Sequence, residues 1–267
     1  MPELPDVELY KRHLDTTSLG RRIEKVAVND ARILAGVSVR EFVQRLEGNR
    51  FESSRRHGKH LLVRLVRDGW LTMHFGMTGY LHYFEDVADD PKYDRVRFDF
   101  ERGHLAYVNR RMLGRVGLAE DFDAFIRDEG LGPDALDPAF DLAALERAID
   151  GRRRDVKSLL MDQSVIAGIG NIYADEILFQ ARLHPKLPVQ ELDKDQRKRL
   201  FRAIKEVLQT AIDCGAGAEQ CLERLPSGYL LPARAKGGRC PRCGGEIQSF
   251  KHQGRTTYFC PRCQPAP

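Results

Sequence analysis

The chain has 267 residues, of which 42% are hydrophobic and 31% charged, a composition that supports an ordinary globular core. No stretch approaches the roughly 18 consecutive apolar residues of a membrane helix. The acids Glu3, Asp6 and Glu8 at the N-terminus exclude a secretory signal. We therefore expect a cytoplasmic protein, and its length favours more than one domain.

Positive charge is concentrated in two parts of the chain. Residues 232–267 contain seven Lys or Arg against one acid, Glu246, which gives this segment +6 and, from a total of +4, leaves −2 for the rest. A second basic stretch runs from Arg50 to Arg67. Clustered cations of this kind attract a phosphate backbone, although a solvated basic face is an equally good interpretation of charge alone.

Residues 1–118 have the pattern of a mostly antiparallel β domain with helices attached. Apolar spacing predicts a helix over 6–17, and a capping box at Ser38 predicts another over 38–47. Turn chemistry at Asp68-Gly69 and Arg102-Gly103 predicts hairpins. Alternation predicts strands at 23–28, 60–67, 70–75, 80–84, 94–101 and 104–108.

The character of the chain then changes. Apolar residues take helical spacing over about 121–213, where four prolines separate the predicted helices (Pro133, Pro138, Pro185 and Pro188). The last segment is rich in Gly, Arg and Cys and is too short for its own core. We predict three parts, 1–118, 119–231 and 232–267.

Four cysteines have the spacing of a metal site. Two Cys-x-x-Cys pairs are separated by 16 residues, and each pair can place two thiolates on one side of a tight turn (Cys240, Cys243, Cys260 and Cys263). Disulfides or a redox pair are the alternatives, and the absence of a signal and the matching pairs favour zinc. Because four sulfurs fill the coordination sphere, we predict one structural Zn²⁺.

Two further motifs are candidates for anion binding. Arg255 follows Gly254 between the cysteine pairs, where a hairpin tip would present its guanidinium, although an ordinary exposed arginine fits equally well. Residues 167–176 join a Gly-rich turn to a helix whose free amides, with Asn171, could bind an anion; such turns often serve close packing alone. Asp175 and Glu176 are interpreted as acids that favour the helix dipole.

The chain begins Met1-Pro2-Glu3. Methionine before a small residue is usually removed, which would leave Pro2 as an N-terminal secondary amine. An α-amine titrates near 7.7–8.0, so a useful fraction is neutral and nucleophilic at pH 7. Its attack on a sugar carbon would give an iminium, with Glu3 able to supply acid–base catalysis. A merely stiff start of the chain is the alternative.

Several motifs, in this order, resemble the formamidopyrimidine-DNA glycosylase and endonuclease VIII family. They are MPELPDVE, Gly58-Lys59 before a strand, His74-Phe-Gly-Met77-Thr-Gly, GIGNIYADE and the Arg255-bearing zinc ribbon. The resemblance spans residues 2–264 and implies an α+β fold. An N-terminal antiparallel β-sandwich would precede a helical helix–two-turns–helix domain with a zinc ribbon hairpin, and double-stranded DNA would lie in a cleft between them.

The resemblance also implies roles for single residues. Pro2 would be the Schiff-base nucleophile, Glu3 the acid–base group at the deoxyribose, and Lys59 the catalytic-site lysine that contacts the phosphate flanking the lesion. Asn171 and Arg255 would bind the DNA backbone, and Lys157 would lie near the lesion. The gap left by the extruded base would be filled by three side chains, those of Met77, Arg111 and Leu113.

The sequence departs from the family in places. Asn109 to Gly114 reads NRRMLG where the family often has DPRRFG, so Leu113 replaces an aromatic wedge and the opposite-base preference is open. Asp6 replaces a usual Glu, and residues 215–232 are short where a lesion-capping loop belongs. PELP in place of PEGP favours the formamidopyrimidine branch, hence oxidised purines over pyrimidines.

The expected protein is a monomeric, bifunctional DNA glycosylase and abasic-site lyase of base excision repair, located at the nucleoid if bacterial. It would excise 8-oxoguanine and formamidopyrimidines through the Pro2 Schiff base and β,δ-elimination, with one structural Zn²⁺ and no membrane partner. A lyase acting only on abasic sites is one alternative. A non-catalytic nucleic-acid-binding protein is the other, and it leaves Pro2, Glu3 and Lys59 unexplained.

Overall fold

The computed structural model describes residues 1–67, 69–218 and 220–266. The chain forms two compact units, one made of Met1–Pro2 and Asp6–Glu129 and the other of Glu3–Pro5 and the chain from Gly130 onward. The second unit therefore includes three residues from the start of the sequence. The three-part division at 118 and 231 stays a prediction.

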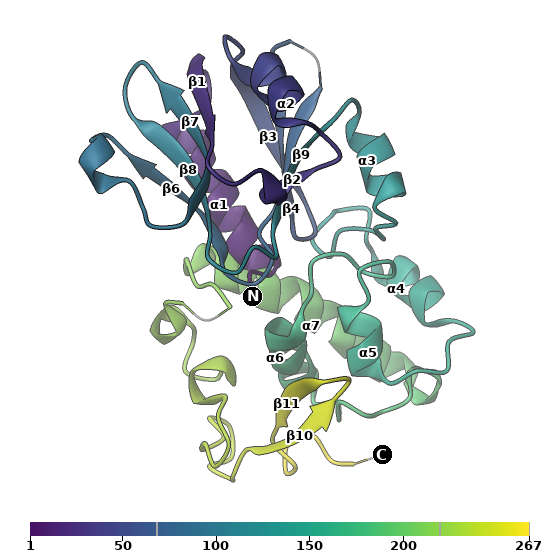
Figure 1. The fold of residues 1–267 in the computed structure, drawn as a ribbon. Coiled ribbons are helices and arrows are strands. Elements are labelled where there is room, and N and C mark those ends of the chain that lie inside the picture. The colour runs from purple at the N-terminus through teal and green to yellow at the C-terminus, as the bar shows by residue number, and fades with distance from the viewer. Residues whose placement is uncertain (68, 219, 267) are drawn as a thin grey trace. The chain divides into compact units, whose positions relative to one another are not determined.

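The first unit is a β-sandwich with attached helices (Figure 1). One sheet has the strand order β1 (Ile23–Val28), β7 (Asp94–Phe100), β8 (His104–Asn109), β6 (Gly79–Phe84). The other has the order β2 (Leu34–Ala35), β9 (Arg115–Ala119), β5 (Trp70–His74), β4 (His60–Leu65), β3 (Phe51–His57). All described pairs are antiparallel except the short β2–β9 pair, which confirms the predicted antiparallel sandwich.

Helices complete this unit. They are α1 (Leu4–Thr17), α2 (Val39–Leu46) and α3 (Phe122–Asp128), with 3-10 turns at Ala31–Ile33 and Val87–Asp89. The Ser38 side chain caps α2 as predicted, accepting a hydrogen bond from the Glu41 amide. Of the two predicted hairpin turns, Gly103 has φ +76°, as a tight turn requires, whereas Asp68 lies outside the described residues.

The basic stretch between Arg50 and Arg67 is a hairpin of β3 and β4, and β3 was not predicted. Its cations make contacts within the unit. The Arg56 guanidinium pairs with Glu8 at 3.0 Å, Arg64 pairs with Glu52 at 3.3 Å, and Arg55 lies 4.4 Å from the Phe122 ring centroid. These three arginines therefore contact residues of their own unit, and the phosphate-binding role predicted for the stretch remains with Lys59 at the turn between the two strands.

The second unit is helical and ends in a β-hairpin. Its helices are α4 (Leu142–Ile149), α5 (Val156–Met161), α6 (Asn171–Ala181) and α7 (Lys194–Asp213). Two of the prolines that the sequence analysis used, Pro133 and Pro138, precede α4, and Pro185 and Pro188 lie between α6 and α7. Three 3-10 turns (Val189–Glu191, Leu222–Arg224 and Leu231–Ala233) precede the hairpin of β10 (Gln248–His252) and β11 (Arg255–Phe259). Among the described residues no helix is long and apolar enough to cross a membrane.

Helix α6 is the central helix of this unit, and it packs against α5, α7 and β11. Nine of its eleven residues are buried, so both its faces lie in the interior. The N-terminal Leu4, fully buried, joins the same core, and its amide donates to the Gly168 carbonyl at 3.0 Å. The start of the chain is therefore fixed at the start of α6.

Candidate active site and zinc hairpin

The Glu3 carboxylate lies at the N-terminal end of α6. It is 1% exposed and accepts three backbone hydrogen bonds, from Gly170 at 2.8 Å, Ile172 at 2.9 Å and Tyr173 at 3.2 Å. The first amides of a helix have no partners within the helix and carry partial positive charge. The anion site predicted for the Gly-rich motif is thus occupied by a carboxylate of the protein itself.

Two glycines permit this close approach. A Cβ atom at Gly170 would overlap the Glu3 carboxyl carbon. Gly168 has φ +114°, and a Cβ there would lie 2.5 Å from Leu4 Cδ1. Any side chain at either position would push the N-terminal segment away from α6. The glycines of the motif therefore position Glu3 rather than exposing amides to a ligand.

Pro2 and Lys59 lie in the β-sandwich unit. Pro2 is buried and precedes Glu3 by one peptide bond. Lys59, 8% exposed, lies in the turn between β3 and β4, next to Gly58, whose φ of +55° closes the turn. The lysine is therefore fixed at the end of a hairpin.

Met77, Arg111 and Leu113 lie on two loops of this unit that touch each other. The Arg111 amide donates to Thr78 Oγ1 at 3.2 Å, and a Cβ at Gly76 would overlap the Leu113 carbonyl. Met77 is 40% exposed and Leu113 51% exposed. Large apolar side chains exposed on adjoining loops are typical of an interaction site.

A buried asparagine supports these loops. Asn109 is fully buried, and its Nδ2 donates to the Phe75 carbonyl at 3.1 Å. The Tyr107 hydroxyl donates to the His74 carbonyl at 2.7 Å, and Gly114 packs against both side chains so closely that a Cβ would overlap them. The NRRMLG segment therefore begins at an asparagine whose side chain is held in place by buried contacts.

The structure brings Asn171 and Arg255 to neighbouring positions. Asn171 Nδ2 donates to the Thr256 carbonyl at 3.1 Å, one residue beyond Arg255. Arg255 starts β11 after a tip in which Gln253 and Gly254 both have positive φ. Its side chain is exposed, and among the described residues its guanidinium has no hydrogen-bond partner or ion pair.

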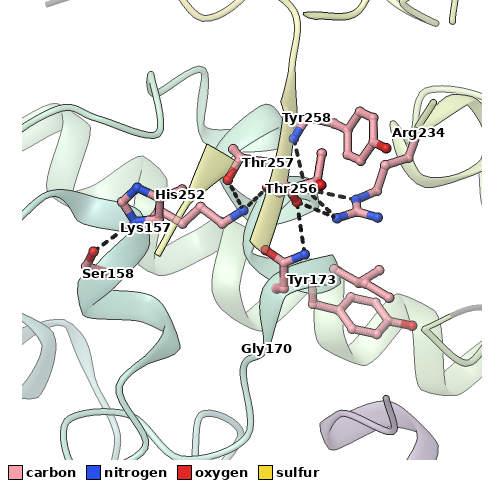
Figure 2. Close-up of polar contacts among 12 residues, drawn as sticks. Lys157, Ser158, Gly170, Tyr173, Arg234, His252, Thr256, Thr257 and Tyr258 are labelled. Carbon is pink, nitrogen blue, oxygen red and sulfur yellow. Dashed lines mark hydrogen bonds and ion pairs between the residues drawn. The ribbon is translucent and has the colours of Figure 1, made fainter. Parts of the chain in front are cut away.

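Lys157 is fully buried and points away from solvent (Figure 2). Its Nζ donates to Asp175 Oδ1 at 2.5 Å and to Thr257 Oγ1 at 2.7 Å. Burial lowers the pKa of Lys157, and the Asp175 carboxylate opposes that shift. The lysine is thus part of the contact between α5, α6 and β11.

Asp175 and Glu176 were interpreted as acids of the first helical turn, and that interpretation is wrong, since α6 begins at Asn171 and its first turn contains no acid. Both side chains are fully buried. Burial raises the pKa of Glu176 to about 7, and its carboxylate accepts from Gln180 Nε2 at 2.7 Å and from the Leu231 amide at 2.8 Å. The surrounding residues of α6, which are mostly apolar, were the signal for burial, because an acid pair among them needs internal partners.

The four cysteines of the hairpin form one cluster. Their Sγ atoms all lie within 4.8 Å of one another, with 3.8 Å between Cys240 and Cys263 and 3.5 Å between Cys243 and Cys260. Tetrahedral zinc with bonds of about 2.3 Å separates its sulfur ligands by about 3.8 Å. The cluster fits a structural Zn²⁺, which confirms the predicted cofactor.

Three family descriptions match consecutive parts of the chain. Residues 1–116 match the formamidopyrimidine-DNA glycosylase N-terminal domain and residues 131–222 its H2TH domain. Residues 237–266 match the zinc finger found in FPG and IleRS. The chain belongs to the formamidopyrimidine-DNA glycosylase family. The predicted β-sandwich, helix–two-turns–helix domain and zinc hairpin are the family's fold.

Relatives of similar length support this assignment. The formamidopyrimidine-DNA glycosylase of Geobacter metallireducens is 36% identical, with 99% of this chain and 100% of the relative covered. That of Heliobacterium modesticaldum is 37% identical, with the same coverage.

Solved structures agree with the fold. The wild-type Lactococcus lactis enzyme in complex with DNA containing N7-benzyl-Fapy-dG has a TM-score of 0.91 and 29% identity, covering 99% of this chain and 100% of that one. The same enzyme bound non-covalently to DNA with an abasic site has a TM-score of 0.88 and 29% identity, with the same coverage.

Proposed function

We propose that this protein is a bifunctional DNA glycosylase and abasic-site lyase that excises oxidised purines, formamidopyrimidines and 8-oxoguanine foremost, from double-stranded DNA. One observation carries the proposal: the carboxylate of Glu3, directly after Pro2, is fixed by three helix amides. A carboxylate held in this way, next to a potential secondary amine, provides an acid–base group beside a nucleophile. The names of the relatives point to the same reaction.

In the proposed reaction the Pro2 nitrogen donates its lone pair to C1′ of the damaged nucleotide. The glycosidic bond breaks, and the base leaves with the electron pair of that bond and takes up a proton. The Pro2 nitrogen, now bonded to C1′, passes its own proton to the Glu3 carboxylate. Its lone pair then opens the C1′–O4′ bond to an iminium while Glu3 delivers that proton to O4′. Loss of the C2′ proton expels the 3′ phosphate, and loss of the C4′ proton expels the 5′ phosphate. This chemistry requires removal of Met1, since the Pro2 nitrogen is otherwise an amide.

The damaged base must leave the helical stack, at a cost of a few kcal/mol. The gap that it leaves would be filled by Met77, Arg111 and Leu113, because exposed side chains on two rigid loops can hold a kinked duplex open. The neighbouring phosphates would be bound by three further residues. These are Lys59, Asn171 and Arg255.

The test is borohydride trapping of processed protein, beginning at Pro2, on duplexes with 8-oxoguanine or an abasic site. Only an iminium is reduced to a stable amine, so we expect an adduct on the N-terminal peptide by mass spectrometry. Pro2→Gly keeps a primary amine and should bind DNA normally but trap and cleave far more slowly. An adduct on Lys59, with Pro2→Gly fully active, would refute the Pro2 assignment.

A cleavage panel separates the proposed glycosylase from a lyase that acts only on abasic sites. It compares duplexes with 8-oxoguanine, formamidopyrimidine, an oxidised pyrimidine and an abasic site. We expect cleavage of the first two and the last. Cleavage of the abasic duplex alone would show that the protein is a lyase that acts only on abasic sites. We further expect a monomer that acts in the cytoplasm.

A further inference from the structure

Asp175, on α6, lies at the centre of a buried network that joins α5 and Arg234 to β11. Figure 2 shows three residues of this network, Lys157, Arg234 and Tyr258. Its Oδ1 accepts from Lys157 Nζ at 2.5 Å, and its Oδ2 accepts from Arg234 Nε at 2.8 Å and from the Tyr258 amide at 3.1 Å. The side chains of Lys157 and Asp175 are fully buried and that of Arg234 is 15% exposed. The proposed reaction assigns no role to this carboxylate.

The network holds three consecutive residues of β11. The Thr256 carbonyl accepts from Asn171, the Thr257 hydroxyl accepts from Lys157, and the Tyr258 amide donates to Asp175. Because two of these bonds involve the backbone of the strand and the third involves the Thr257 side chain, the strand can neither slide nor rotate without breaking a bond. The residue that precedes them is Arg255.

The other side of the hairpin tip is held as well. Ser158 Oγ lies 2.9 Å from His252 Nε2 and accepts from Gln253 Nε2 at 2.9 Å. The backbone on both sides of Arg255 is therefore fixed to the helices, while the zinc cysteines fix the opposite end of the hairpin. Zinc alone leaves the direction of the tip undetermined.

We propose that Asp175 is a positioning residue that, with Lys157, sets Arg255 and Asn171 at the spacing of one DNA phosphate. The inference rests on the proposed function and deepens its DNA-binding step. Lys157 then acts through the hairpin and makes no contact with the damaged base. Its loss weakens binding to lesion and abasic duplexes alike.

Charge explains why one carboxylate can have this effect. Asp175 lies between two cations, Lys157 and Arg234. Replacing it by Asn leaves the fully buried Lys157 and the partly buried Arg234 without this counter-charge, which strongly disfavours the arrangement. The hairpin residues that bind Lys157 and Arg234 would separate from α6, and Arg255 would lose its fixed position.

The test is the affinity for a duplex containing a stable abasic-site analogue, measured by fluorescence anisotropy. We expect Asp175→Asn to bind at least about tenfold more weakly, with its trapping rate at saturating abasic DNA within about threefold of the parent. Asp213→Asn, an exposed acid of α7, is the matched control and should bind normally. Zinc content should equal that of the parent.

A double-mutant cycle with Arg255→Ala separates positioning from general destabilisation. If Asp175 acts through Arg255, Asp175→Asn should weaken binding less than about twofold in the Arg255→Ala background. A full tenfold loss in that background would overturn the proposal. Should Asp175→Asn fail to fold, Thr257→Val removes the bond to Lys157 while nearly keeping the shape of the side chain. The same double-mutant cycle with Arg255→Ala then tests the positioning role.

The outcomes also separate this inference from the proposed function. A parent protein that binds the duplex but is never trapped would refute the proposed chemistry, and the binding cycle would still decide the role of Asp175. A parent that is trapped, with Asp175→Asn and Arg255→Ala fully additive, would refute the positioning role alone.

Discussion

Single residues show which features of the site the sequence alone can predict and which it cannot. Glu3 could be singled out from the start of the chain, but the amides that hold it lie 167–170 residues further on. Lys157 was placed by resemblance, while its partner Asp175 was interpreted as an acid that favours the helix dipole. Local patterns identify a side chain's chemistry, whereas a partner that is distant in sequence follows from the tertiary fold.

The position of Glu3 leads to a prediction for Glu3→Gln. The amide cannot deliver a proton to O4′, and its NH₂ group would face backbone N–H donors. We expect excision of 8-oxoguanine to slow by about 10² or more in single-turnover assays. Nicking of a preformed abasic site should fall much less, because an abasic sugar opens to its aldehyde in water without a proton from Glu3.

Glu41→Gln, on the exposed start of α2, is the control and should match the parent on both substrates. Equal losses on the two substrates in Glu3→Gln would show that Glu3 serves folding or DNA binding instead.

At the scale of elements, prediction succeeded where side-chain patterns were strong. The strand at Ile23–Val28 and the helix capped by Ser38 have the expected bounds or nearly so. Strand β3 was missed because it is an edge strand with mostly polar side chains, of which only Phe51 is buried. Strand β9 was missed because its five residues follow a loop without a clear turn signal.

The two adjoining loops of the β-sandwich lead to a prediction about the base opposite the lesion. Leu113 offers less flat surface than an aromatic side chain, so stacking against the opposite base is weaker. We expect Leu113→Phe to increase the ratio of cleavage rates between favoured and disfavoured opposite bases several-fold. If the parent already discriminates strongly and the substitution leaves the ratio unchanged, selectivity lies in other residues.

The zinc hairpin leads to a prediction about metal removal. Cys240→Ser, or a strong chelator, should release the hairpin, abolish DNA binding and leave the β-sandwich folded. Trp70, the single tryptophan, lies in the sandwich and reports its state. We expect unchanged Trp70 fluorescence together with loss of DNA binding. A purified protein that contains no zinc, without any chelator, would contradict this prediction.

The whole molecule consists of two units with different buried ionisable groups. In the sandwich, burial lowers the pKa of His60 to about 3 and that of His74 to about 4, and their rings lie 4.8 Å apart. Both ring nitrogens of His60 are buried, without a hydrogen-bond partner in the described structure. In the helical unit, burial raises the pKa of Glu176 to about 7.

These shifts predict how stability depends on pH. A histidine with a lowered folded pKa contributes fully above about pH 6.5, and the contribution is lost as the pH falls toward 3–4. The raised pKa of Asp94, to about 7, offsets part of this effect. We expect the Trp70 unfolding midpoint to fall between pH 6.5 and 4, and less steeply in His60→Phe. Parallel curves for parent and variant would contradict the assignment.

The division of the first residues between the units has a consequence for fragments of the chain. Pro2 belongs to one unit and Glu3 to the other, although a single peptide bond joins them. A gene fragment ending at Glu129 would encode both residues without the amides that hold the carboxylate, and the remaining fragment would encode the amides alone. Neither fragment alone therefore carries both the Glu3 carboxylate and the amides that bind it, so we expect neither half to be active on its own.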